Sequence, residues 1–234
     1  MQTLLTFISS ADQCQYLPGQ EWRFEYHIVA DATASEYGDR LRAGWRRFGF
    51  SLFRPACDHC TQCHSLRVPV ATFRPDRSQR RAWTSNNGAV TLSIGTPSDG
   101  RENRALYDKF HSHQHETKGW SDGASDYHEM FVANPFPTEE WRYTIEGRLI
   151  GVGYVDRVPD GLSLIYFFHD PDERARSIGT FNILTALDVA RRAGLRFVYL
   201  GYYVKGCRSL EYKGRFQPNE TLSRGKVWVP FLNR

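Results

Sequence analysis

The chain has 234 residues, a formal net charge of +4 and a pI near 8.8, a balance that permits contact with nucleic acid without requiring it. Hydrophobic residues make up 41% and aromatic residues 14%, which excludes a disordered chain and can fill one large core or two smaller ones. No apolar run is long enough to span a bilayer, and Met1 to Cys14 lacks the pattern of a secretory signal, so we expect a cytoplasmic protein without membrane contact.

The first hundred residues indicate strands around one helix. Alternating or continuous apolar residues predict the strands, and apolar residues spaced by four and three predict the helix. These elements are expected at 21–30 (strand), 32–47 (helix), 50–53 (strand) and 66–73 (strand). The stretch 90–100 is rich in Gly, Ser, Thr and Pro, so we place a boundary near it and expect domains at 1–95 and 96–234.

The remaining residues indicate a helix, three strands, a second helix and a last strand. Gly147 and the turn Pro159-Asp160-Gly161 separate the three strands and predict antiparallel hairpins. The expected elements are 102–118 (helix), 141–146, 149–158 and 162–169 (strands), 179–193 (helix) and 197–202 (strand). His111, His113 and His115 end the first helix, and their spacing leaves open a metal site or a polar helix surface.

Three cysteines follow one another at a regular spacing, Cys57, Cys60 and Cys63. In a reducing compartment such a cluster favours a metal or redox role over disulfides. With Cys14 as a fourth ligand, the thiolates suit tetrahedral zinc or an iron–sulfur cluster. The second pair of cysteines that zinc knuckles usually carry is missing, so a reduced set of thiols, redox-sensitive or structural, is the alternative.

A basic run, Phe73-Arg-Pro-Asp-Arg-Ser-Gln-Arg-Arg81, follows the cysteines and carries four arginines within eight residues. Such a strip suits a polyanion, and a solvated surface is the plain alternative. A second cluster consists of Arg40, Arg42, Arg46 and Arg47, and the same two interpretations apply to it.

The order of elements after residue 100 resembles the fold of the acetyl-coenzyme A-dependent N-acetyltransferases. In that fold a loop wraps an anion at the N-terminus of the long helix, where backbone N–H groups are unpaired. The matching loop here is Arg176-Ser-Ile-Gly-Thr-Phe181. Phe181 stands where the pattern has a small residue, so we expect it to hinder a pyrophosphate and to indicate a different acyl donor. The expected fold class is α+β, with an N-terminal cysteine-containing α/β domain followed by an acyltransferase-like domain that has a mixed, mainly antiparallel sheet.

Several longer segments carry a more specific pattern. They are Cys14-Gln-Tyr-Leu-Pro-Gly, Phe53-Arg-Pro-Ala-Cys-Asp-His-Cys-Thr-Gln-Cys63, Arg67-Val-Pro-Val, the basic run 73–81, Leu164-Ile-Tyr-Phe-Phe-His-Asp-Pro-Asp172, the loop 176–181, Tyr199-Leu-Gly-Tyr-Tyr-Val-Lys-Gly-Cys207 and Tyr212-Lys-Gly-Arg-Phe-Gln-Pro218. In this order they resemble the arginyl-tRNA–protein transferase family, in its bacterial aspartate/glutamate leucyltransferase branch. Because the segments span nearly the whole chain and several reach eight residues, chance agreement is excluded.

The resemblance implies an enzyme that takes leucine from leucyl-tRNA and attaches it to the N-terminal amine of proteins that begin with Asp or Glu. The product is a peptide bond, and the new N-terminal leucine marks the protein for degradation. Because the aminoacyl ester is already activated, no cofactor is required, and zinc or an iron–sulfur cluster at the cysteines stays an open addition. The family also contains arginine-transferring enzymes. An acetyl-coenzyme A-dependent N-acetyltransferase and a non-catalytic RNA-binding protein on a metal knuckle are the alternatives.

The implied chemistry needs an oxyanion donor, a base and cations for an acidic acceptor and for tRNA. The expected catalytic residues are Tyr166, His169, Asp170 and Tyr202. The residues expected to bind the acceptor are Arg176, Tyr203, Lys213 and Arg215. The residues expected to bind tRNA phosphates are Arg74, Arg77, Arg80 and Arg81.

Overall fold

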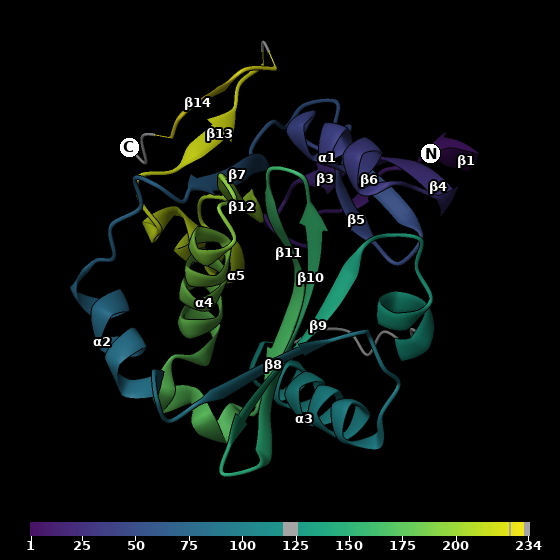
Figure 1. The fold of residues 1–234 in the computed structure, drawn as a ribbon. Coiled ribbons are helices and arrows are strands. Elements are labelled where there is room, and N and C mark those ends of the chain that lie inside the picture. Colours follow the sequence, from purple (N-terminus) through teal and green to yellow (C-terminus); the bar gives the residue numbers. More distant parts are fainter. Residues whose placement is uncertain (119–125, 225, 232–234) are drawn as a thin grey trace.

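A mixed sheet of eight strands forms the centre of the computed structural model, in the order β14-β13-β7-β12-β11-β10-β9-β8 (Figure 1). The structure describes residues 1–118, 126–224 and 226–231. The strands are β7 (His64–Pro69), β8 (Thr91–Gly95), β9 (Thr138–Ile145), β10 (Arg148–Val158), β11 (Gly161–His169), β12 (Phe197–Tyr203), β13 (Glu220–Leu222) and β14 (Trp228–Pro230). Neighbours are antiparallel except β11 and β12, which run parallel, so the predicted class is confirmed.

A second sheet, in the order β1-β4-β6-β5, is built from the N-terminal segment. Its strands are β1 (Gln2–Ile8), β4 (Phe24–Asp31), β5 (Arg46–Phe48) and β6 (Ser51–Pro55); β2 (Asp12–Gln13) and β3 (Glu21–Trp22) form a separate short pair. Helix α1 (Ala34–Arg42) joins β4 to β5. The helix predicted at 32–47 is therefore too long. Gly44, at φ +87°, turns the chain so that the Trp45 N–H donates back to the Arg40 carbonyl at 3.0 Å, and Arg46 begins a strand.

Helices cover both faces of the large sheet. They are α2 (Arg77–Asn86), α3 (Arg101–Lys118), α4 (Ile178–Arg192) and the single turn α5 (Arg208–Glu211), with the short turns η1 (His128–Val132), η2 (Pro171–Arg176) and η3 (Tyr212–Arg215). α2 and α4 lie on one side of the sheet, and α3 and the N-terminal sheet lie on the other (Figure 1). The helices predicted at 102–118 and 179–193 are thus confirmed. Among the described helices, none has the length and apolar character needed to cross a membrane.

Two strands from the first hundred residues belong to the large sheet. β7 lies between β12 and β13, and β8 forms the edge beside β9. The strand predicted at 66–73 ends at Pro69, because the Phe73 N–H bonds back to the Pro69 carbonyl in a turn. Thr91–Gly95, which composition places at a boundary, is a paired strand instead. Residues on both sides of position 95 therefore share one sheet.

Three groups of buried apolar side chains fill the space between these layers. The largest lies beneath α2 and α4 and includes Trp141 and Leu187. The second joins α1 and the N-terminal sheet to the large sheet, with the Tyr37 ring packed against Phe136. The third, rich in aromatic rings such as Phe131, lies beneath α3. Burial of this apolar surface on both faces holds the sheet as the middle layer.

A buried ion pair ties the N-terminal sheet to the large sheet. Arg47 on β5 donates to both carboxylate oxygens of Asp156 on β10, and the two side chains are 1% and 0% exposed. The Thr138 hydroxyl donates to the same carboxylate at 2.8 Å, and the Arg47 guanidinium lies over the Phe136 ring. Because both charges are fully partnered, the pair fixes how the two sheets meet.

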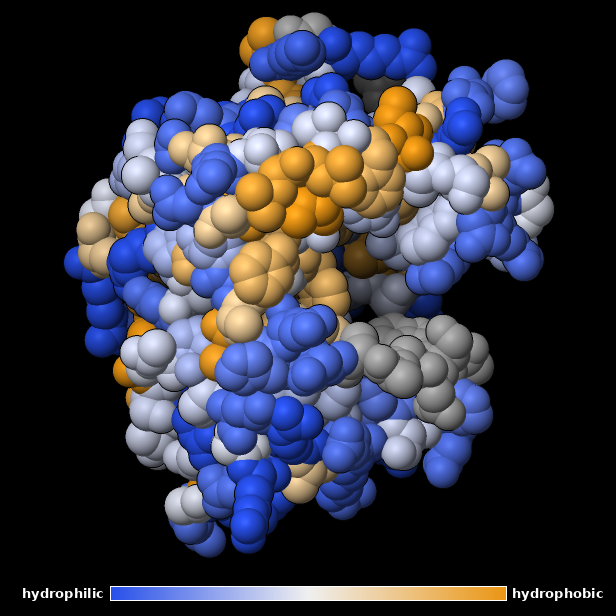
Figure 2. Space-filling model, turned by 90° about the vertical axis from the view of Figure 1, so that its right-hand side faces the viewer, coloured by the Kyte–Doolittle hydropathy of each residue, from blue (hydrophilic) through white to orange (hydrophobic). Residues whose placement is uncertain are grey.

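The outer strand of the N-terminal sheet carries exposed apolar side chains. Leu4, Leu5, Phe7 and Ile8 on β1 are each at least 43% exposed. β1 pairs only with β4 in the described chain, so its other edge is open. This side of the molecule faces the viewer in Figure 2, where apolar surface crosses the upper half of the view. β1 is thus an exposed edge strand of apolar character.

Candidate active site

The parallel strands β11 and β12 separate part-way along their length. Their ladder consists of three residue pairs, Gly161–Phe197, Leu162–Val198 and Ser163–Tyr199. Gly161 permits this close start, because a Cβ there would lie 2.4 Å from the Phe197 carbonyl oxygen. Beyond Ser163 no ladder joins the two strands in the described residues. We call the resulting gap the β11/β12 opening, and its unpaired backbone groups suit it to hold a substrate.

An arginine from the N-terminal sheet reaches into the β11/β12 opening. Arg46 on β5 donates from Nη1 to the Ser163 hydroxyl at 3.1 Å and from Nη2 to the Leu164 carbonyl at 2.6 Å. It is only 7% exposed, and no carboxylate of the described residues forms an ion pair with it. A guanidinium buried in this way still lacks a negative partner.

A second cation lies beside Arg46. Gly201 on β12 has a φ of +87°, and a Cβ built there would lie 3.4 Å from Arg46 Nη2 and 3.5 Å from Lys213 Nζ. Burial, together with the positive charge of Arg46, lowers the pKa of the Lys213 ammonium from 10.5 to about 7. The missing side chain of Gly201 leaves space where the two cations meet. We call these two residues the Arg46–Lys213 pair.

The three predicted tyrosines lie in different parts of the fold. Tyr202 donates its hydroxyl to the Gly44 carbonyl at 3.3 Å, which ties β12 to the N-terminal sheet. Tyr203 is buried in the core beneath α2 and α4. Tyr166 lies beneath α3, with its hydroxyl 2.9 Å from His111 Nε2. Burial raises the pKa of both the Tyr202 and the Tyr166 phenol. Of the three, Tyr202 is close enough to Arg46 for that charge to act on its pKa.

The two predicted bases, His169 and Asp170, lie where β11 ends. The Asp170 carboxylate accepts from Lys109 at 2.6 Å and from Arg148 at 2.9 Å, and it caps η2 through the Asp172 N–H at 3.1 Å. Burial alone would raise its pKa, but these bonds hold the pKa below the usual value. The carboxylate is therefore a weak base that fixes the loop before α4. His169 Nδ1 lies 3.1 Å from the Asp170 carbonyl oxygen.

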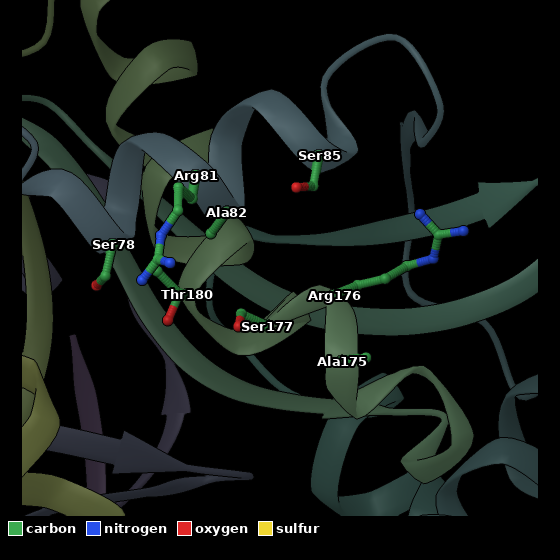
Figure 3. A pocket seen from close by; sticks show the side chains of 8 residues that line it. All are labelled: Ser78, Arg81, Ala82, Ser85, Ala175, Arg176, Ser177 and Thr180. Carbon is green, nitrogen blue, oxygen red and sulfur yellow. The ribbon is translucent and has the colours of Figure 1, made fainter.

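A polar cavity of about 350 Å³ lies between α2 and the start of α4 (Figure 3). It is lined by Ser78, Arg81, Ala82, Ser85, Ala175, Arg176, Ser177 and Thr180. The first backbone N–H groups of α4 lie at this end, and the space beside Gly179 is open, with no atom within 4 Å of a Cβ there. In Figure 3 the Arg81 side chain points toward Thr180. A helix N-terminus with hydroxyls and a guanidinium suits a phosphate.

The expectation for Phe181 is wrong. The ring is 5% exposed and packs into the core, 5.6 Å from the Trp83 ring and 6.2 Å from the Tyr143 ring. Because the side chain points toward the sheet and away from the loop, it does not crowd a phosphate at the start of α4. The steric argument against a pyrophosphate ligand therefore fails. Trp83 is partly buried and packs against the same core.

Two residues predicted to hold the acceptor lie beside α2 instead of the β11/β12 opening. Arg176 lines the cavity, and its Nε donates to Glu173 at 2.8 Å; in Figure 3 its guanidinium extends away from Arg81. Arg215 donates to Ser78 at 3.0 Å, at the start of α2. Of the predicted acceptor residues, Lys213 is the one that lies next to Arg46.

The predicted tRNA-binding arginines belong to an exposed surface. Arg77, Arg80 and Arg81 lie on α2 at spacings of three and four and so share one helix face, while Arg74 precedes the helix. Asp76 caps α2 by accepting the Gln79 N–H at 2.8 Å. Because Arg81 also lines the cavity, this surface continues outward from it.

All five cysteines are free thiols. Burial and neighbouring thiols raise the pKa of Cys63 to about 12. Within residues 1–118, 126–224 and 226–231, no group of three His, Cys, Asp or Glu side chains is arranged to hold a metal ion, and this includes His111, His113 and His115. Cys14, Cys57 and Cys60 lie near enough to Cys63 to act on its thiol, and a metal or cluster at these four residues stays a prediction.

Arg46 is the site residue that the sequence pattern does not single out. It falls in an arginine cluster that is typical of a solvated surface. The sequence feature that could have revealed Arg46 is Gly44. A glycine near the end of a helix favours a left-handed turn that ends the helix, and here strand β5 begins at Arg46 soon after that turn.

The protein is acyltransferase-like. Its parallel strands β11 and β12 separate and leave unpaired backbone groups, and the start of the following helix, α4, borders a cavity suited to a phosphate. Two family models match the chain: Arginine-tRNA-protein transferase, N terminus, over residues 12–81, and Arginine-tRNA-protein transferase, C terminus, over residues 102–223. The chain belongs to this family.

Similar proteins include an aspartate/glutamate leucyltransferase of Campylobacter jejuni, 35% identical, with 94% of this chain and 93% of the relative covered. Another, from Alkalilimnicola ehrlichii, is 38% identical, with 98% and 96% covered. Among solved structures, L-PGS from Bacillus licheniformis matches with a TM-score of 0.47 at 11% identity, over 75% of this chain and 52% of that chain.

Proposed function

We propose that the protein is an aminoacyl-tRNA–protein transferase that moves leucine from leucyl-tRNA to the N-terminal amine of proteins beginning with Asp or Glu. The observation that carries the proposal is the phosphate-suited cavity at the start of α4, continued by the arginine face of α2. Relatives at 35% and 38% identity carry the leucyltransferase name. The product is a degradation signal, and we expect the enzyme to act in the cytoplasm.

The donor, leucyl-tRNA, binds through its 3′ end and the nucleotides next to it. Phosphates near that end occupy the cavity at Arg81 and Thr180, and the exposed arginines of α2 contact the sugar–phosphate backbone. The aminoacyl ester then extends into the β11/β12 opening. One aminoacyl-tRNA molecule can therefore bind with its phosphates in the cavity and its ester in the β11/β12 opening.

The reaction is aminolysis of an ester. A neutral N-terminal amine attacks the leucyl carbonyl carbon, a C–N bond forms, and the C–O bond to the ribose breaks. Since an α-amino group titrates near pH 7.7–8.0, a useful fraction is neutral in the cell, and positioning supplies much of the catalysis. Unpaired backbone N–H groups of the β11/β12 opening can donate to the developing oxyanion.

A transfer assay tests this function. The protein is mixed with radiolabelled leucyl-tRNA, arginyl-tRNA or acetyl-coenzyme A, and with peptides that begin with Asp, Glu, Lys or Arg. We expect label from leucyl-tRNA in the Asp and Glu peptides. Label from acetyl-coenzyme A alone would instead identify an N-acetyltransferase, and label from no donor would refute the proposal.

Replacing Arg176 with alanine tests the donor role of the cavity. Because Arg176 borders the cavity with its guanidinium paired to Glu173 and turned away from Arg81, its charge acts on the donor only from the rim, and we expect the KM for leucyl-tRNA to rise about twofold to threefold. The preference for Asp over Asn peptides should not change. A rise in the peptide KM alone would place Arg176 at the acceptor. Steady-state kinetics with each substrate varied in turn measures both.

A further inference from the structure

A buried positive charge without a negative partner destabilises a folded protein. Arg46, 7% exposed, is such a charge in the β11/β12 opening, and the partly buried Lys213 lies beside it. Arg46 bonds only to the neutral oxygens of Ser163 and Leu164. In the described chain, Lys213 Nζ has no carboxylate partner either, and burial and Arg46 both disfavour its charged form. A buried arginine without a carboxylate, beside a lysine whose charged form is disfavoured, is typical of a site whose missing charge comes from a ligand.

The orientation of the Arg46 guanidinium indicates which chemical group the ligand presents. Both Nε and Nη2 of the guanidinium face the space over Gly201, at 3.5 and 3.4 Å from where a Cβ would lie, and Lys213 Nζ borders the same space at 3.5 Å. The Nε–Nη2 edge is the fork that matches the two oxygens of a carboxylate. The bonds to Ser163 and Leu164 hold this fork in place.

We propose that the Arg46–Lys213 pair binds the side-chain carboxylate of the acceptor's first residue, and that Lys213 also takes the proton that the acceptor's α-ammonium must lose before it attacks. The inference rests on the proposed function and adds to it an acceptor site and a proton path. The donor phosphates have their own cavity at α4, so the enclosed pair is left for the small carboxylate.

One residue of the acceptor brings both groups to Lys213. In N-terminal Asp or Glu the carboxylate and the α-ammonium belong to the same residue, so a lysine paired with the first lies close to the second. Neutral Lys213 accepts one proton from the ammonium, which leaves a neutral amine. The amine then attacks the ester, and its remaining extra proton passes to the departing ribose oxygen. Lys213 returns its proton to water after the product leaves.

The charges around Lys213 make the transfer of a proton from the α-ammonium to Lys213 favourable only when the acceptor is acidic. The titratable and charged groups that act on it are Arg46, from β5, and Cys207, at the start of α5. With its pKa near 7, about half of free Lys213 is neutral at pH 7 and can accept a proton. A bound carboxylate raises that pKa, because it stabilises the ammonium form. A neutral side chain such as Asn gives no such stabilisation.

The test measures kcat and KM separately for peptides that begin with Asp or with its uncharged isostere Asn, with leucyl-tRNA as donor. The variants are Lys213→Gln, Lys213→Arg, Arg46→Gln and Arg46→Lys, with Arg208→Gln as a control on the exposed side of α5. We expect Lys213→Gln to lower kcat/KM for Asp about 100-fold and to leave Asn unchanged. Lys213→Arg should keep the KM for Asp but lower kcat at pH 7, with recovery toward pH 9, where the ammonium deprotonates unaided.

Thermal unfolding separates a site role from a structural one. The folded pKa of Lys213 lies below its unfolded value of 10.5, so the lysine destabilises the free protein at neutral pH, and this loss shrinks as the pH rises from about 7 to 10.5. Lys213→Gln should therefore show an equal or higher Tm at pH 7. Arg46→Lys, which keeps the charge but loses the fork, should raise the KM for Asp.

The outcomes are distinct. If Lys213→Gln and both Arg46 variants keep the wild-type preference for Asp over Asn, the carboxylate site is wrong. An unchanged kcat–pH profile in Lys213→Arg would overturn the proton path. Wild-type protein that transfers leucine to neither peptide would refute the proposed function itself, whatever the variants do.

Discussion

Replacing Arg80 and Arg81 together with alanine is expected to weaken the binding of leucyl-tRNA about tenfold or more at low salt. Both side chains are exposed on α2, and Arg81 also lines the cavity. Each lost phosphate contact removes one released counterion, so the plot of log K against log salt should flatten by about 0.7–0.9 per arginine. Titration of labelled tRNA over a series of salt concentrations measures the slope.

The matched control for this experiment is the pair Arg191→Ala and Arg192→Ala. These arginines are exposed at the far end of α4, so the control removes the same net charge away from the cavity. If the control flattens the salt dependence as much as the α2 variant does, then general charge and not the α2 face governs tRNA binding.

Replacing Arg47 with methionine is expected to lower the free energy of unfolding by about 3–5 kcal/mol. The change leaves Asp156 buried without its partner, 0% exposed between the two sheets. Arg192→Met is the control, because the Arg192–Asp188 pair lies on the surface, with Arg192 78% exposed, and such pairs contribute about 0–1 kcal/mol. Urea denaturation of both variants measures the difference. Equal losses in the two would show that burial of the Arg47–Asp156 pair does not matter.

The elements that the sequence predicts well are those whose signals are local. The helices after residue 100 and the hairpins between them follow from apolar spacing and from turn residues such as Gly147. The helix at 32–47 extends too far because apolar spacing continues across Gly44, while the left-handed turn there depends on backbone bonds that spacing does not reveal. β8 is hidden for a different reason: its small and polar residues suit an edge strand as well as a linker.

The site residues also divide into those that the sequence predicts and those that depend on the fold. Lys213 and the α2 arginines stand in segments that the family resemblance carries, and the structure places them at the β11/β12 opening and at the rim of the cavity. Arg46 and Phe181 depend on which way a side chain points across the fold. Arg46 turns inward to Ser163 from a strand more than a hundred positions away, and Phe181 turns into the core. Neither direction follows from local pattern.

The position of β7 has a consequence for synthesis of the protein. β7 leaves the ribosome early, yet the strands that flank it, β12 and β13, end at residues 203 and 222. Until nearly the last residue is made, both edges of β7 are open and its apolar side chains, such as Leu66, are uncovered. β7 therefore cannot enter its sheet until the C-terminal strands are made, and the unfinished chain exposes apolar surface of the kind that chaperones shield.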